Sequence, residues 1–108
     1  MRVKWTPEAK GQWRDTAMYI LHKFGKNAKD VFMQEIRQTS MLLGKFPNMG
    51  KDEPLLADCK RAYRSIVVGR LNKIVYNVDN DIVYIVAFWD TRREPKTQAE
   101  QVNDQPTE

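Results

Sequence analysis

Basic residues gather in the C-terminal half of the sequence, at positions where they could bind phosphate. From Cys59 to Val78 the chain has five lysines and arginines and no acidic residue, and Arg92 and Arg93 follow shortly afterwards. Guanidinium groups on a rigid sheet suit phosphate binding, or stabilisation of the pentavalent phosphate formed during RNA cleavage. The same charges also suit a solvated strand face that discourages edge pairing, and the sequence leaves both interpretations open.

The strands expected in this region determine which basic residues can meet. Period-two alternation predicts strands over Tyr63–Val68, Lys73–Val78 and Asp81–Trp89, with a turn at 69–72 and a two-residue loop at Asp79–Asn80. The first and third strands of such a meander run in the same direction, so the third ends beside the first turn. The third is apolar on both faces and is expected inside the sheet. A basic edge is therefore expected where the end of the third strand lies beside the turn between the first two strands, with Arg64 farther along the first strand. Its members are Arg61, Arg64, Arg70, Lys73, Arg92 and Arg93.

Side chains for acid–base, thiol or metal chemistry are scarce. Asp90 stands beside the arginines, which would hold it ionised and make it a weak base. His22 is the only histidine and Cys59 the only cysteine, too few for a zinc site or a disulfide framework. There is no Gly-rich phosphate loop. We therefore expect no metal and no small-molecule cofactor.

Two amphipathic helices are predicted ahead of the strands. Thr6 suits an N-cap with Pro7 as the first helical residue, and Gly25 suits the C-cap. A second helix is expected to begin near Asn27 and to end at Gly44. Apolar residues spaced by three and four give each helix one core-facing stripe. The stripes are Ala9, Trp13, Ala17, Ile20, Leu21 and Phe24, then Ala28, Val31, Phe32, Ile36, Thr39 and Leu43.

Together these elements predict an α+β fold with the order β-α-α-β-β-β. A short strand at Arg2–Trp5 precedes the helices, and an antiparallel sheet packs against the N-terminal helical hairpin. Residues 1–95 are expected to form one domain, followed by an acidic, disordered tail at residues 96–108.

Charge and hydropathy narrow the class of partner and the compartment. Residues 1–93 carry 17 basic and 10 acidic side chains, a net charge of +7, whereas residues 94–108 carry −3. A basic body favours nucleic acid or an acidic protein as partner, although such a charge also occurs in ordinary domains. No apolar run approaches the ~18–20 residues that span a bilayer. A single cysteine fits a reducing compartment, so we expect the cytoplasm and no membrane partner.

Several short segments, in this order, resemble the RelE/ParE superfamily of bacterial type II toxin–antitoxin systems, also called plasmid stabilisation proteins. They are Val3–Ala9, Tyr19–Ile20, Leu43–Gly50 with Phe46–Gly50 in it, Tyr63–Arg64, Lys73–Val78, Ile82–Phe88 and Asp90–Pro95. The opening residues, Tyr63–Arg64 and the ending with Arg92 and Arg93 look closer to the ParE branch. That branch implies a growth-inhibiting toxin that binds DNA gyrase and is neutralised by a cognate antitoxin. The antitoxin's C-terminal segment would wrap the toxin, and a groove near Trp13 and Met18 is a candidate docking place.

The RelE branch implies an enzyme instead, a ribosome-dependent endoribonuclease (mRNA interferase) whose partners are the ribosome and mRNA. By position, its catalytic basic residues correspond to Arg64, Lys73 and Arg92. A further basic position falls on Ile66, and no Tyr or His follows Trp89, so this set is incomplete. Whether the chain is an enzyme stays open at this point. A non-toxic family member acting as an interaction module is the third alternative.

Overall fold

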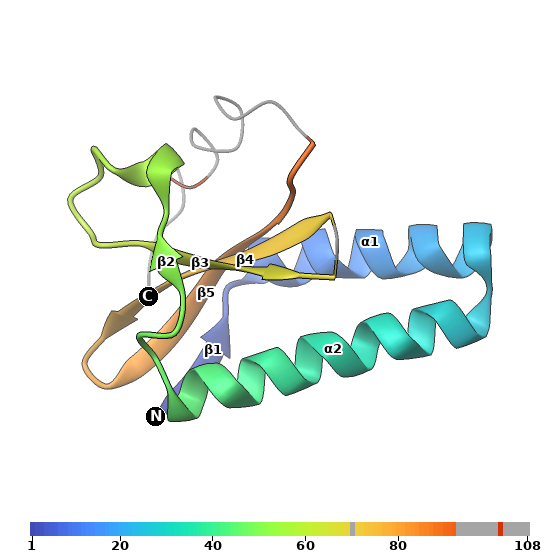
Figure 1. Ribbon diagram of the computed structural model, residues 1–108, viewed down its shortest axis with the longest axis horizontal. Helices are drawn as coiled ribbons and strands as arrows, with labels where there is room; N and C mark the ends of the chain where they lie inside the picture. The colour runs from blue at the N-terminus through green and yellow to red at the C-terminus, as the bar shows by residue number, and fades with distance from the viewer. Residues whose placement is uncertain (70, 93–101, 103–108) are drawn as a thin grey trace.

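The chain opens with a strand that leads directly into a long helical hairpin (Figure 1). The computed structural model describes residues 1–69, 71–92 and 102. Strand β1 (Arg2–Trp5) is followed by helices α1 (Pro7–Phe24) and α2 (Lys26–Lys45). The remaining elements are β2 (Lys51–Asp52), the 3₁₀ turn η1 (Pro54–Leu56), β3 (Arg64–Val68), β4 (Asn72–Asp79) and β5 (Ile82–Asp90). The predicted α+β class and the helical hairpin are confirmed.

The turn of the helical hairpin is shorter than the sequence predicts. The side chain of Thr6 accepts a hydrogen bond from the Ala9 amide, as expected of the N-cap of α1. Gly25, at a φ of 97°, is both the C-cap of α1 and the N-cap of α2. This left-handed conformation lets one glycine reverse the chain, so α2 begins at Lys26 rather than after a cap at Asn27.

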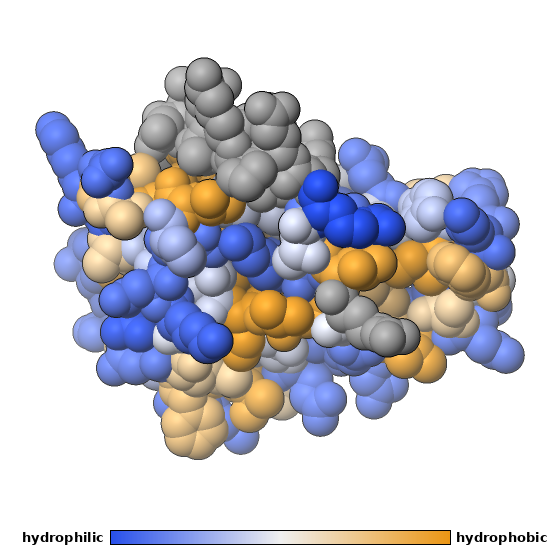
Figure 2. Space-filling model, turned by 45° about the horizontal axis from the view of Figure 1, so that its top comes forward, coloured by the Kyte–Doolittle hydropathy of each residue, from blue (hydrophilic) through white to orange (hydrophobic). Residues whose placement is uncertain are grey.

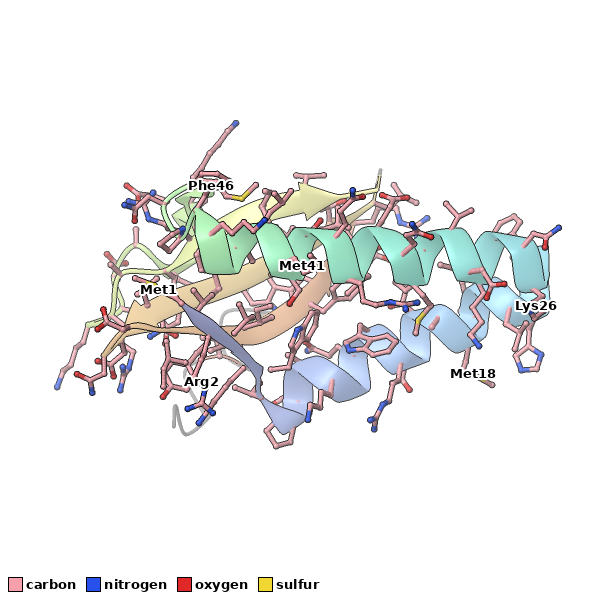
Figure 3. All side chains as sticks on the ribbon, turned by 90° about the horizontal axis from the view of Figure 1, so that it is seen from below. Met1, Arg2, Met18, Lys26, Met41 and Phe46 are labelled. Carbon is pink, nitrogen blue, oxygen red and sulfur yellow. The ribbon has the colours of Figure 1, made fainter. Side chains whose placement is uncertain are left out.

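Gly44 lies inside α2 instead of ending it, and its role is close packing. A Cβ atom at this position would lie 2.9 Å from the carbonyl oxygen of Met1 and 3.3 Å from a methyl group of Val3. The amino terminus also donates a hydrogen bond to the Gly44 carbonyl over 2.8 Å. Figure 3 shows Met1 beside this end of α2. The missing side chain therefore lets β1 approach the helix.

The sheet has five strands in the order β1-β5-β4-β3-β2 and is mixed rather than wholly antiparallel. The predicted meander of β3, β4 and β5 is antiparallel, and β5 lies inside the sheet as expected. However, β1 pairs with β5 in parallel, with Arg2 opposite Ile82. The two-residue strand β2, which was not predicted, pairs with β3. The β4–β5 loop is Asn80–Asp81, both at positive φ, one residue later than predicted.

A hydrophobic core lies on each face of the sheet. The helix-side core includes Ile36, Leu43, Ile74, Tyr76 and Phe88, and the helix-free core consists of Leu56, Val75, Val86, Ala87, Trp89 and Val102. A β-bulge at Val86 lets neighbouring apolar residues of β5 serve both cores, because Val75 lies opposite Ala87 while Tyr76 lies opposite Ile85. Apart from Val102, the predicted tail lies outside the described residues. No helix in the described part of the chain is long and apolar enough to cross a bilayer.

Candidate functional site

The described members of the basic edge are divided between the two faces of the sheet. Lys73 lies opposite Val67 and Trp89, and its ammonium group is on the helix-free face. Arg64 lies opposite Tyr76, which packs in the helix-side core. Arg92 follows β5 and lines a groove on the helix side. The edge therefore does not present one row of cations. Arg70 and Arg93 lie outside the described residues.

Lys73 forms a largely buried ion pair on the helix-free side of the sheet. Its Nζ atom lies 2.6 Å from Oε1 of Glu53 and 5.3 Å from the centroid of the Trp89 ring. The Lys73 side chain is 16% exposed and that of Glu53 is fully buried. Burial raises the pKa of Glu53, but hydrogen bonds from Lys73, the Leu55 amide and Ser65 outweigh burial and bring this pKa below its ordinary value. Lys73 therefore has a structural role, because it neutralises a buried carboxylate.

Arg64 and Tyr76 hold the loop that follows α2. Nη1 of Arg64 donates a hydrogen bond of 2.8 Å to the carbonyl oxygen of Gly50. The Tyr76 hydroxyl donates to the Pro47 carbonyl over 2.8 Å and accepts from the Gly50 amide over 2.9 Å. Tyr76 is fully buried, and this burial raises the pKa of its hydroxyl. The loop, one of the segments that carried the family resemblance, is therefore fixed by side chains of β3 and β4.

The other two described cations of the edge have carboxylate partners nearby. Arg92 forms a two-point contact with Asp90, with nitrogen–oxygen distances of 3.1 and 2.9 Å, and this partner raises the pKa of Arg92. Arg61 lies 3.4 Å from Asp79 in an exposed pair. Both pairs are open to solvent, where a salt bridge typically contributes little to stability.

The three residues proposed for RNA cleavage do not share a pocket. Arg64 pairs with Tyr76 of β4, whereas Asp90, two residues before Arg92, pairs with Asn72. Along β4, Tyr76 and Asn72 are four residues apart, roughly 14 Å. The ammonium group of Lys73 lies on the helix-free face, opposite to the groove that Arg92 lines. As they are placed in this structure, the three cations do not converge on one point. Among the described residues there is also no cluster of three metal-ligating side chains.

An open groove of about 650 Å³ lies between the helical hairpin and the β3–β4 turn. Its floor includes Phe32, Val68 and Phe88, and Tyr19 and Leu71 lie along its exposed sides. Figure 2 shows apolar atoms gathered beside the end of the β-sheet and continuing onto the helices. The volume lies within the range of ligand-binding clefts. This groove was not predicted from the sequence, although the apolar residue Leu71 in a predicted turn pointed to it.

The groove is apolar because the helical hairpin extends beyond the sheet (Figure 1). The predicted core stripes include Phe24 and Val31, yet these residues are 64% and 61% exposed. This part of the prediction is wrong, because the sheet ends before the tip of the hairpin and leaves the stripes without a partner there. Exposed apolar surface of this kind marks interaction sites.

The predicted docking place near Trp13 and Met18 does not coincide with the groove. Trp13 packs against the helix-side core and meets Trp5 edge to face, with 6.2 Å between the ring centroids. Its role in core packing, the alternative use, is confirmed. Met18 is exposed on the outer side of α1 (Figure 3) and does not line the groove.

Taken together, these features define a class of small α+β domain in which a helical hairpin covers one face of a sheet and leaves an apolar groove beside it. A family model described as the ParE toxin of type II toxin–antitoxin systems, parDE, matches residues 3–95. The chain therefore belongs to the ParE toxin family, as its resemblance to the ParE branch predicted, and this family implies an antitoxin partner.

The fold is also found in a solved structure of the chromosomal ParDE TA system from P. aeruginosa. The similarity has a TM-score of 0.70 at 17% sequence identity and covers 85% of this chain and 97% of that chain. At this identity the likeness establishes the fold alone. No curated protein matches the sequence significantly.

Proposed function

We propose that this protein is a cytoplasmic toxin that stops growth by binding and inhibiting DNA gyrase, and that a co-encoded antitoxin neutralises it. The protein acts by binding and not by cleaving RNA. Membership of the ParE family supports a toxin–antitoxin role. The choice of a binding mechanism depends on the site.

The observation that carries this choice is the separation of Arg64, Lys73 and Arg92. Phosphoryl chemistry needs cations held in one place around the reacting phosphate. Here Lys73 is paired with buried Glu53, Arg64 binds loop carbonyl groups, and Arg92 is held by Asp90. Each cation is occupied by the protein itself, which supports binding over catalysis.

The antitoxin part of the proposal is supported by the charge and shape of the molecule. Residues 1–93 carry a net charge of +7, which favours a partner with acidic residues. The apolar groove offers a surface that a folding segment of the antitoxin can cover. Burying that surface would also remove from water apolar groups of a kind that marks interaction sites.

Two readouts test the proposal in the same cells. The protein is expressed from an inducible promoter with and without the product of the adjacent upstream gene. Plasmid supercoiling and mRNA integrity are then followed after induction. We expect growth arrest with loss of negative supercoiling, intact mRNA, and rescue by the upstream product.

Purified components identify the target directly. We expect the purified chain to inhibit gyrase supercoiling in vitro. Normal supercoiling together with cleaved ribosome-bound mRNA would establish the endoribonuclease instead, and harmless expression would indicate a non-toxic interaction module.

A further inference from the structure

The groove carries acidic side chains although the body of the protein is basic. Three carboxylates line it, from Asp15 on α1, Glu35 on α2 and Asp90 at the end of β5, against the single guanidinium of Arg92 among its described lining residues. Arg92 is neutralised by its two-point contact with Asp90. Among the lining residues that the structure describes, the charges that remain to meet an occupant are therefore those of Asp15 and Glu35.

These two carboxylates are placed to face whatever enters the groove. Both are exposed, and neither has an ion-pair partner among the residues that the structure describes. Oε2 of Glu35 lies 3.9 Å from the position that a Cβ atom would take on Gly69. Glu35 thus extends from α2 toward the β3–β4 turn, across the mouth of the groove.

The apolar lining sets the rest of the occupant's chemistry. Tyr19, Phe24 and Val31 from the hairpin and Leu71 from the β3–β4 turn expose large side chains along the groove. An occupant must cover them with apolar side chains of its own to remove them from water. A purely acidic segment would meet Asp15 and Glu35 at close range and be repelled.

We propose that the groove receives an apolar segment of the antitoxin that carries a lysine or arginine opposite Asp15 and Glu35. This inference rests on the proposed function, because it names the chemistry of the partner at that site. The acidic residues of the antitoxin then contact the basic surface elsewhere, and the basic residue fixes the register of the segment in the groove. Asp15 and Glu35 are the residues that determine this specificity.

A displayed library of random 14-residue peptides tests the chemistry without knowledge of the partner. The library is selected on the immobilised full chain and, in parallel, on the Asp15→Asn/Glu35→Gln double variant and on Leu71→Asp. A matched control, Asp58→Asn, removes an exposed carboxylate that does not line the groove. We expect apolar sequences with an added lysine or arginine on the wild-type and control chains. The double variant should lose the enrichment in basic residues. The Leu71→Asp variant should lose the enrichment in apolar residues.

Synthetic peptides then give the size of the preference. The best sequence is compared with a version in which glutamate replaces its basic residue, and each is titrated into the ¹⁵N-labelled chain. We expect the basic peptide to bind about 5–20-fold more tightly than the glutamate peptide and to change the chemical shifts of groove residues. The two peptides should bind the double variant with equal affinity.

Some results would overturn this assignment. They are selection of no sequence, enrichment of acidic residues, shifts confined to surfaces outside the groove, or a preference that survives in the double variant. These assays contain no gyrase and no antitoxin. A chain that still inhibits supercoiling while failing them refutes the groove assignment alone.

Discussion

Lys73 and Glu53 form a desolvated ion pair, with 2.6 Å between Nζ and Oε1, beneath the helix-free face of the sheet. The ring of Trp89 faces the same ammonium group at 5.3 Å, a distance at which a cation and an aromatic ring attract. The carboxylate also accepts a hydrogen bond of 2.9 Å from the Leu55 amide. The pair therefore connects β4 to the segment around η1, and this connection has consequences for stability.

Removal of the ammonium group should destabilise the protein strongly. Lys73→Met leaves the Glu53 carboxylate buried without its cation, and we expect the free energy of unfolding to fall by about 3 kcal/mol. Urea denaturation followed by circular dichroism measures this change. The matched control is Lys60→Met at an exposed position, which should change stability by less than about 0.5 kcal/mol. Equal effects of the two variants would contradict a structural role for the pair.

Stability should depend on pH through Glu53. The pKa of this carboxyl is lower in the folded protein than its ordinary value of 4.5. The folded state therefore binds the proton less readily than the unfolded state. The contribution of Glu53 is then fully present above pH 4.5 and is lost as the pH falls through the folded pKa. Urea midpoints of the wild type and Glu53→Gln should converge as the pH is lowered from 7 to 3, and a constant gap would contradict the assignment.

Two glycines should respond in opposite directions to the same substitution. A Cβ atom on Gly50 would lie 2.7 Å from the Tyr76 hydroxyl and 2.8 Å from the carbonyl oxygen of Ser65, whereas nothing lies within 4 Å of one on Gly11. Gly50→Ala should therefore destabilise by about 1–3 kcal/mol, while Gly11→Ala in α1 should stabilise by about 0.5–1 kcal/mol. Thermal melts of the two variants test this contrast, and a stabilised Gly50→Ala would refute the close contact.

The local parts of the fold could be predicted because local chemistry determines them. Thr6 and Pro7 start α1, and Gly25 ends it, through short-range hydrogen bonds and backbone preferences. The parallel pairing of β1 with β5 joins Arg2 to Ile82, and no local pattern encodes the direction of so distant a pair. The β4–β5 loop lies one residue later than predicted, because both Asn80 and Asp81 tolerate positive φ.

The site was harder to predict because it depends on which face each side chain occupies. Lys73 and Arg92 are near each other in the strand register, yet Lys73 contacts Glu53 on the helix-free face and Arg92 lines the groove on the other. The apolar stripe through Phe24 gave the correct helical face but not the point at which the sheet ends. The residues around Lys73 in the sequence do not indicate that its partner is Glu53, which lies in a distant segment.

The two arginines should separate function from folding. Arg92 and Asp90 are 64% and 30% exposed in their side chains, so Arg92→Ala should change the free energy of unfolding by less than about 0.5 kcal/mol. Arg64 donates to the Gly50 carbonyl in a partly buried position, so Arg64→Ala should cost about 2 kcal/mol. Urea denaturation measures both, and gyrase supercoiling and ribosome-dependent mRNA cleavage are assayed beside it. Under a binding mechanism, neither variant changes mRNA cleavage, which is absent from the wild type as well. A wild-type cleavage activity that falls by orders of magnitude in the stable Arg92→Ala variant would instead make Arg92 a catalytic residue.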